Sequence, residues 1–321
     1  MNSSPQHREI GVYLGEALAR YGFLADHPLA SVRYRAFVSA FEAAGLGARV
    51  NVLAPVPATQ DDVLRFHNAE HLRRVRRHDA DPTGLLDAGD TPDFPGMLDA
   101  SLHVVGSSLD ACRRVLTGEL TRAFVPIGGL HHARRNAAAG FCVFNDIGIL
   151  IETLRIVHGV ARIAYVDIDA HHGDGVYYEL ADDPELFIAD FHEDGRYLYP
   201  GTGDATETGL GAARGTKLNV PLPPGADDAL FLRLWPTAYR FIDAARPEIV
   251  LLQCGADCLA EDPLTHLRLS TAIHARVTRD LCEIADRHCR GRLLITGGGG
   301  YNPLNTAAAW VTVIEVLCAA T

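Results

Sequence analysis

A chain of 321 residues with 48% hydrophobic side chains can bury a sizeable core within one α/β domain. Its formal net charge of −11 argues against binding to the nucleic-acid backbone. The apolar stretch 306–320 is too short to span a bilayer and contains Glu315, so no membrane partner is expected. The seven cysteines form no CxxC pair, and residues 1–5 do not start a signal peptide. We therefore expect reduced thiols and a cytoplasmic location.

Short β-branched runs alternate with longer helical patterns along the chain. The expected strands lie near 10–14, 49–53, 122–126, 162–167, 186–190, 217–221, 248–252 and 292–296. The expected helices lie near 29–45, 59–78, 98–117, 145–158, 173–180, 227–245, 270–289 and 303–319. The stretches 79–95 and 191–216 are expected loops. This alternation predicts a central, mostly parallel eight-stranded sheet flanked by helices, and no linker divides the single domain expected over residues 1–321.

Unusual residues follow four of the expected strands at their carboxyl ends, where an open parallel sheet binds its ligands. The four segments are Gly128 to His132, Asp167 to Asp174, Cys254 to Asp257 and Gly297 to Tyr301. Because these strand ends meet at one edge of the sheet, we expect the four segments to form one site.

The spacing Asp167-x-Asp169-x-His171 predicts a metal site. Alternate side chains of an extended segment point the same way, so Asp169 and His171 can reach one ion. Asp257, from another strand end, would complete three ligands and leave a position open for water. A single Asp or His here more often caps a helix or lies in a solvated loop, but the whole cluster favours a catalytic metal. Two carboxylates and one imidazole suit zinc, with Fe(II) as a competitor.

The pair His131-His132 is a weak signal alone, since paired loop histidines are often polar filler. Here Asp167 and Asp174 are available to orient the two rings and raise their basicity. Two His–Asp pairs beside a metal ion predict a proton relay for hydrolysis.

The glycine run 297–300 allows close approach of the backbone to a ligand. A phosphate-binding loop would continue with Lys and Ser or Thr, and this one continues with Tyr301, so nucleotide binding is not expected. The hydroxyl of Tyr301 could donate to a developing oxyanion. The alternative interpretation is a tyrosine packed under the start of a helix.

These motifs together resemble the histone deacetylase family, in particular class I and the bacterial acetoin-utilization type. The matching segments run in family order over nearly the whole chain: Tyr21-Gly22, His27-Pro28, Gly128 to Ala133, Gly140-Phe141-Cys142, Asn145-Asp146, Tyr165 to Gly175, Tyr199 to Gly203, Leu252 to Asp257 and Gly297 to Asn302. The resemblance implies the arginase/deacetylase fold. It also implies a zinc-dependent deacetylase that hydrolyses the amide of an N-acetylated amine, with acetyl-lysine in proteins as the expected substrate.

The resemblance further implies a role for each candidate residue. The metal ligands are Asp169, His171 and Asp257, and the catalytic residues are His131, His132, Asp167, Asp174 and Tyr301. His132 would act as general base and then general acid, His131 would stabilise charge, and Tyr301 would hold the oxyanion. The substrate would contact Asp90 at the rim, Phe141 and Tyr199 as tunnel walls, Gly140 and Leu264. Arg33 loosely matches an arginine at the foot of the tunnel.

Two positions depart from the family's pattern. The second tunnel wall is usually Phe, and Tyr199 makes the mouth more polar. The family's serine before a Phe-His pair is here Asp190, and in the family that serine helps to hold a structural potassium ion. The resemblance therefore implies a potassium site, with altered affinity, near Asp167, Asp169, His171 and Asp190.

Three alternative functions stay open. The first is an amidohydrolase for acetylpolyamines or other small acylamines, although the run Gly-Gly-Leu-His-His is more typical of lysine deacetylation. The second is an arginase-like two-metal ureohydrolase, which needs more bridging aspartates than the sequence offers after Asp257. The third is a non-catalytic binder of acylated amines, which should have lost His132, Tyr301 or a ligand. We expect the loop 79–97 to cap the pocket or contact a neighbouring subunit.

Overall fold

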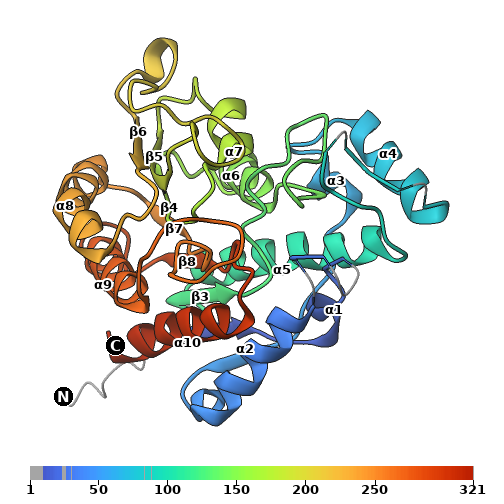
Figure 1. Cartoon of the computed structure of the whole chain (residues 1–321), viewed down its shortest axis with the longest axis horizontal. Coiled ribbons are helices and arrows are strands. Elements are labelled where there is room, and N and C mark those ends of the chain that lie inside the picture. The colour runs from blue at the N-terminus through green and yellow to red at the C-terminus, as the bar shows by residue number, and fades with distance from the viewer. Residues whose placement is uncertain (1–9, 24–26, 30, 83, 88, 321) are drawn as a thin grey trace.

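The structure is a computed structural model that describes residues 10–23, 27–29, 31–82, 84–87 and 89–320. The segment 1–5, on which the signal-peptide expectation rests, lies outside these residues. One eight-stranded sheet has the order β2-β1-β3-β8-β7-β4-β5-β6 (Figure 1). Its strands are β1 (Ile10–Tyr13), β2 (Asn51–Leu53), β3 (Arg122–Val125), β4 (Ile163–Asp167), β5 (Leu186–Glu193), β6 (Lys217–Leu222), β7 (Ile249–Gln253) and β8 (Leu293–Thr296).

All the strand pairings of this sheet are parallel, which confirms the predicted fold class. The central strands β4, β7 and β8 are buried at every position. Helices cover both faces of a parallel sheet, so its strands are apolar throughout rather than alternating. This pattern explains why runs such as Ile249–Gln253 could be identified from the sequence.

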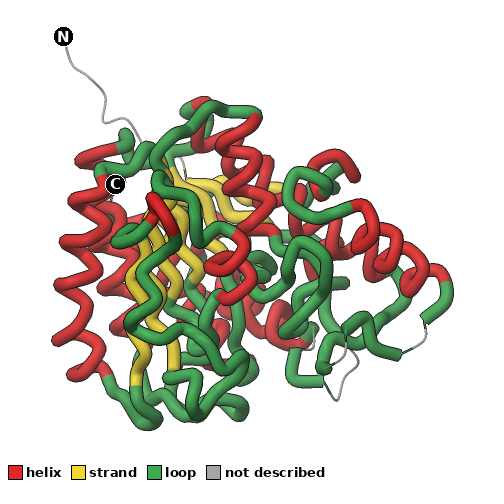
Figure 2. Tube along the Cα trace, turned by 90° about the horizontal axis from the view of Figure 1, so that it is seen from above, coloured by secondary structure: helices red, strands yellow, loops and turns green. Residues whose placement is uncertain are grey.

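Helices lie on both sides of the sheet (Figure 2). They are α1 (Glu16–Ala19), α2 (Val32–Ala43), α3 (Gln60–Val63), α4 (Ala69–Ala80), α5 (Met97–Thr117), α6 (Asp146–Ile156), α7 (Asp174–Glu179), α8 (Asp228–Ala245), α9 (Thr271–His288) and α10 (Pro303–Ala319). Along one layer, α2 packs on α10, α10 on α9 and α9 on α8, whereas α5 packs on α6 and α6 on α7. Among the described residues, no helix combines the length and the apolar character that a membrane span requires.

Polar caps fix the starts of several helices. The side chain of Ser270 accepts a hydrogen bond from the Ala272 N–H and caps the start of α9. Asn145 caps α6 in the same way, with its Oδ1 accepting from the Gly148 N–H at 2.8 Å. The Nδ2 group of Asn145 also donates to the carbonyl of Ala133 at 2.9 Å, so this cap ties α6 to the loop that carries the paired histidines.

Two of the differences from the predicted boundaries have a clear physical reason. The single helix expected over 59–78 is wrong: α3 ends at Val63, and α4 begins only after Asn68. The side chain of Asn68 caps α4, and its N–H donates to the carbonyl of Arg135 at 2.8 Å, which holds the chain out of the helix. The loop expected from residue 191 is also wrong at its start, because β5 continues to Glu193 in pairing with β6.

Candidate active site

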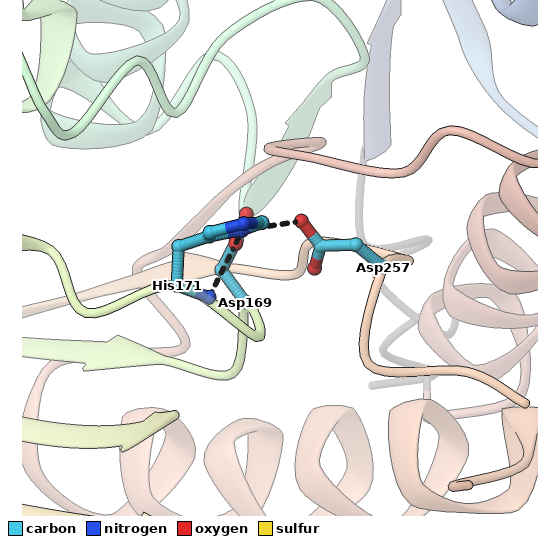
Figure 3. Close-up of side chains that lie close together, drawn as sticks. All are labelled: Asp169, His171 and Asp257. Carbon is cyan, nitrogen blue, oxygen red and sulfur yellow. Dashed lines mark hydrogen bonds and ion pairs between the residues drawn. The ribbon is translucent and has the colours of Figure 1, made fainter. Parts of the chain in front are cut away.

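Three ionisable side chains from two strand ends gather at the carboxyl edge of the sheet. Asp169 and His171 follow β4, and Asp257 follows β7. The Nδ1 atom of His171 lies 3.1 Å from Oδ1 of Asp169 and 3.1 Å from Oδ2 of Asp257 (Figure 3). All three residues are buried, with ligand atoms within 4.8 Å of one another. Among the described residues, this is the one group of three or more His, Cys, Asp or Glu side chains that could hold a metal ion. An arginase-like site would need ligands for two ions.

The charges of this group favour a bound cation. Burial and then the negative charge of Asp169 raise the pKa of Asp257 to about 7. Two buried carboxylates around one imidazole are costly unless a positive charge compensates them. Without a metal, burial opposes a charge on His171, but Asp169 and Asp257 outweigh burial and raise its pKa to about 10, so the imidazolium takes the place of a cation. Two carboxylates and one imidazole are a ligand set typical of a catalytic zinc site with three protein ligands, and the same set also suits Fe(II). The residues therefore fit a divalent cation.

Backbone amides hold the two carboxylates in place. Oδ2 of Asp169 accepts from the Gly299 N–H at 2.8 Å and from Nε2 of Gln253 at 2.7 Å. Oδ1 of Asp257 accepts from the Ala170 N–H at 2.8 Å. A Cβ atom on Gly299 would lie 2.1 Å from Oδ2 of Asp257, so only glycine allows this close approach. Each carboxylate thereby turns its other oxygen toward the imidazole.

The two paired histidines lie in the connection between β3 and α6. Nδ1 of His131 donates to Oδ2 of Asp167 at 2.7 Å, and Nδ1 of His132 donates to Oδ1 of Asp174 at 2.8 Å. The two Nε2 atoms are 3.0 Å apart. Because two lone pairs would repel at this distance, one Nε2 carries a proton that it donates to the other. The two rings therefore share one proton.

The surrounding charges place that proton on His131. Burial opposes a charge on this ring, but the carboxylates of Asp167 and Asp169 outweigh burial and raise the pKa of His131 to about 10. Burial and then the positive charge of His131 lower the pKa of His132 to about 4. His132 is thus the neutral ring of the pair, which is the state a proton acceptor needs.

Gly140 allows the ring of His132 to adopt its position. A Cβ atom on Gly140 would lie 2.3 Å from Cδ2 of His132, closer than any side chain tolerates. Any larger residue at position 140 would therefore displace the ring from Asp174.

Tyr301 reaches the same site from the loop after β8. Its ring lies edge-on to His171, with centroids 6.1 Å apart, and its N–H donates to Oδ2 of Asp262 at 2.8 Å. Burial and then the charge of Asp257 raise the pKa of the Tyr301 hydroxyl well above its usual range. The hydroxyl therefore stays protonated and can donate a hydrogen bond.

Arg33 of α2 holds the glycine loop that carries Tyr301. Its guanidinium donates to the carbonyl oxygens of Gly298 at 2.5 Å and Gly300 at 3.0 Å. The side chain is buried and stacks over the ring of Trp310. The structure thus gives Arg33 a positioning contact beneath the site.

A cavity of about 210 Å³ leads from this site to the surface. Its lining residues are Asp90, His132, Gly140, Phe141, His171, Leu198, Tyr199, Leu264 and Tyr301. The structure therefore brings all five predicted substrate contacts to one cavity. The ring of Tyr199 packs against His132, with centroids 5.2 Å apart, and its side chain is partly exposed at the mouth.

Phe141 forms the opposite wall with an unusual backbone. Its φ of 66° lies in the left-handed region, which is rare for a bulky residue and costs free energy. Its N–H donates to Oγ1 of Thr91 at 3.1 Å, and its carbonyl accepts from the hydroxyl of Tyr21 at 2.9 Å. These two bonds hold the ring at the cavity wall.

Asp90 lies at the mouth of the cavity, on a loop that Asp87 organises. Oδ1 of Asp87 accepts from the N–H groups of Gly89 at 3.0 Å, Asp90 at 3.1 Å and Thr91 at 3.0 Å. The loop in this way presents the Asp90 carboxylate, whose pKa is raised by burial and then by the Asp87 charge.

Asp190 lies on β5, opposite Asp167 of β4. Its Oδ1 is 2.7 Å from Nδ1 of His192, and its Oδ2 accepts from the Gly173 N–H at 2.9 Å. Nε2 of His192 lies 2.9 Å from the carbonyl oxygen of Gly203. Both ring nitrogens face acceptors, so His192 donates from both and is positively charged. This histidine already neutralises Asp190, and the potassium ion stays a prediction.

We expect Asp190→Ala to lower the free energy of unfolding by about 3–5 kcal/mol, because it leaves the buried His192 cation without its partner. Urea denaturation would measure the change. Asp204→Ala, which removes an exposed carboxylate, is the control and should change stability little. A loss below about 1 kcal/mol for Asp190→Ala would show that the pair is not a buried ion pair.

Three contributors to the site had no role in the sequence prediction. The hydroxyl of Tyr165 donates to Oδ2 of Asp167 at 2.5 Å, and Nη2 of Arg134 donates to Oδ2 of Asp174 at 3.1 Å. Gln253 binds Asp169 as described. Tyr165 and Asp167 are two residues apart on one strand and share a face, so the period of the strand could have found this contact.

Comparisons with known proteins agree with this geometry. A model of the histone deacetylase domain matches residues 27–317. The chain therefore belongs to the histone deacetylase family, as the sequence motifs predicted.

Individual relatives extend over most of the chain. The acetoin utilization protein AcuC of Bacillus subtilis (strain 168) is 33% identical over 290 residues, which cover 88% of this chain and 75% of the relative. Histone deacetylase clr6 of Schizosaccharomyces pombe is 31% identical over 312 residues, covering 94% of this chain and 75% of the relative. The crystal structure of the HDA15 HD domain superposes with a TM-score of 0.89 at 24% identity, covering 98% of this chain and 89% of that one. The last similarity concerns the fold alone.

Proposed function

We propose that this protein is a zinc-dependent deacetylase that hydrolyses the amide of acetyl-lysine side chains in proteins, with Fe(II) as an alternative ion. The observation that carries the proposal is the buried group Asp169, His171 and Asp257 at the foot of a walled cavity, facing the His131–His132 pair. Membership of the histone deacetylase family and the similarity to the clr6 deacetylase support this substrate class.

Asp169, His171 and Asp257 would hold a divalent cation, which would supply a Lewis acid for the amide carbonyl and lower the pKa of water. Nε2 of the neutral His132, which accepts a hydrogen bond from His131 in the free protein, exchanges that bond for one from the attacking water, accepts the water's proton and returns it to the leaving amine. Asp174 holds Nδ1–H of His132, so the ring keeps its orientation through both transfers. His131 stays protonated and stabilises negative charge, and the hydroxyl of Tyr301 donates to the oxygen that becomes an oxyanion.

The cavity supports a linear acylated amine as the substrate. Its two aromatic walls, Phe141 and Tyr199, suit a straight alkyl chain. At the mouth, the Asp90 carboxylate can accept N–H groups from the backbone of a peptide. The same carboxylate, with Asp87 near it, would also attract a cationic nitrogen, and this observation keeps an acetylpolyamine amidohydrolase as the second candidate.

Acetate release from an acetyl-lysine peptide tests the proposal. We expect release by the purified protein, loss of release after treatment with a chelator, and recovery on addition of zinc or Fe(II). An acetylated polyamine assayed in parallel separates the two candidate substrates. Full activity without metal, or no hydrolysis of either substrate at any metal loading, would contradict the proposal.

A further inference from the structure

Helix α4 presents four arginines in a chain of net charge −11. They are Arg73, Arg74, Arg76 and Arg77. Arg74 is half-buried and the other three are exposed. Within the part of the chain that the structure describes, none of them forms an ion pair with a carboxylate, whereas Arg113, Arg114, Arg134 and Arg135 all do. Like charges three and four residues apart on a helix repel one another, and a bound anion would relieve the repulsion between Arg73, Arg76 and Arg77.

Arg74 lies directly beside the mouth of the active-site cavity. It lines a groove of about 760 Å³ together with His78, Leu86, Asp87, Gly89, Asp90, Ala137, Ala138, Ala139 and Tyr199. Asp90 and Tyr199 line the cavity as well, so the groove continues from the point where a substrate backbone would leave the cavity. Residues next to an acetyl-lysine in the cavity would therefore enter this groove.

The other charged groups of the groove are largely engaged within the protein. The carboxylate of Asp87 accepts three N–H groups of its own loop. Nδ1 of His78 lies 2.8 Å from Oδ2 of Asp93. Asp90 faces the cavity mouth, on the edge that groove and cavity share. Among the described residues, Arg74 is the residue of α4 that brings an unpaired positive charge to the groove. Arg77 lies about one turn further along the same helix.

We propose that α4 selects acetyl-lysine substrates that carry acidic residues beside the acetylated lysine. A flanking Asp or Glu carboxylate binds Arg74 in the groove, and Arg73, Arg76 and Arg77 attract the acidic segment at longer range. The same arginines oppose the attraction that Asp90 and Asp87 exert on acetylated polyamines, whose free nitrogens are cationic. This inference rests on the proposed deacetylase function and narrows its substrate class to acidic stretches of acetylated proteins.

The test compares two acetyl-lysine peptides that differ only in having Glu or Gln beside the acetylated lysine. We expect kcat/KM of the wild-type protein to be about five- to tenfold higher for the Glu peptide, through a lower KM, as for a partly desolvated charge pair. This ratio should fall toward one in Arg74→Gln, should be partly kept in Arg74→Lys, and should shrink at about 0.5 M NaCl. Because both peptides are assayed with the same variant, a folding defect does not change the ratio.

Arg279→Gln is the matched control, since Arg279 is an exposed arginine of α9 and its loss should leave the ratio unchanged. An acetylated polyamine should be hydrolysed more efficiently by Arg74→Gln than by the wild type. Equal kcat/KM for the two peptides in the wild type, or a ratio that Arg74→Gln keeps, would overturn this inference while the deacetylase function stands. If neither peptide releases acetate, both fail together.

Discussion

Replacing Tyr301 by Phe is expected to lower kcat for an acetyl-lysine peptide by about 10²–10³, because one donor to the oxyanion is lost. The same experiment with His132→Ala should cost about 10²–10⁴, since the ring accepts and returns the proton in both transfers. Tyr301 suits this role because burial keeps its hydroxyl protonated. His132 suits its role because Asp174 fixes the ring through Nδ1, while Nε2, which lies 3.0 Å from Nε2 of His131, carries no proton of its own.

Steady-state kinetics of acetate release would measure both losses. Tyr197→Phe removes a hydroxyl from an exposed tyrosine, and His158→Ala removes an exposed imidazole from the turn after α6, so both controls should stay near wild-type kcat. The tyrosine and histidine variants should bind metal as the wild type does, because neither residue belongs to the ligand group. Full activity in Tyr301→Phe and His132→Ala would remove these residues from the mechanism.

A second large effect is expected for Asp257→Asn. The variant should lose the bound metal ion, because one of two anionic donors is replaced by a neutral amide. In the metal-free protein, however, the substitution removes a buried carboxyl group whose pKa is raised to about 7 by burial and then by the charge of Asp169. We therefore expect the metal-free variant to be at least as stable as the metal-free wild type, while it gains nothing from added zinc.

Metal analysis and thermal unfolding together test this expectation. Zinc at 100 times its dissociation constant should stabilise the wild type by about 2.7 kcal/mol and leave Asp257→Asn unchanged. Asp262→Asn, a nearby carboxylate outside the ligand group, is the matched control and should keep its metal. Retention of one ion per chain by Asp257→Asn would show that this residue is not a ligand.

The sequence was sufficient to predict the sheet because its strands carry their own signal. Runs such as Ile163–Asp167 and Ile249–Gln253 are apolar at nearly every position, which only strands buried on both faces require. The division of the helix expected over 59–78 had a weaker local signal, the cap residue Asn68. It depends on hydrogen bonds from Asn68 and Asn145 to partners far along the chain, Arg135 and His67, and such contacts exist only after folding.

The candidate site was predictable to the extent that its residues stand at strand ends. Asp169, His171 and Asp257 lie there, and the structure places them together. The contribution of Gln253 depends on strand register, because it lies opposite Asp167 in the pairing of β4 with β7. The pairing of Asp190 with His192 likewise depends on β5 extending to Glu193, beyond the predicted end. Register and strand length follow from neighbouring strands, which a single segment does not reveal.

Asn145 shows how the active site limits the residues that a helix start can use. As a cap for α6 alone, Asp, Ser or Thr would serve about as well as Asn, since each offers an oxygen to the first turn. Here the other end of the side chain must give a proton to the carbonyl of Ala133, just beyond the histidine pair. An aspartate at position 145 would place a carboxylate oxygen against the carbonyl oxygen of Ala133. Only an amide satisfies both sides, so a position that looks interchangeable in terms of helix propensity accepts one residue type.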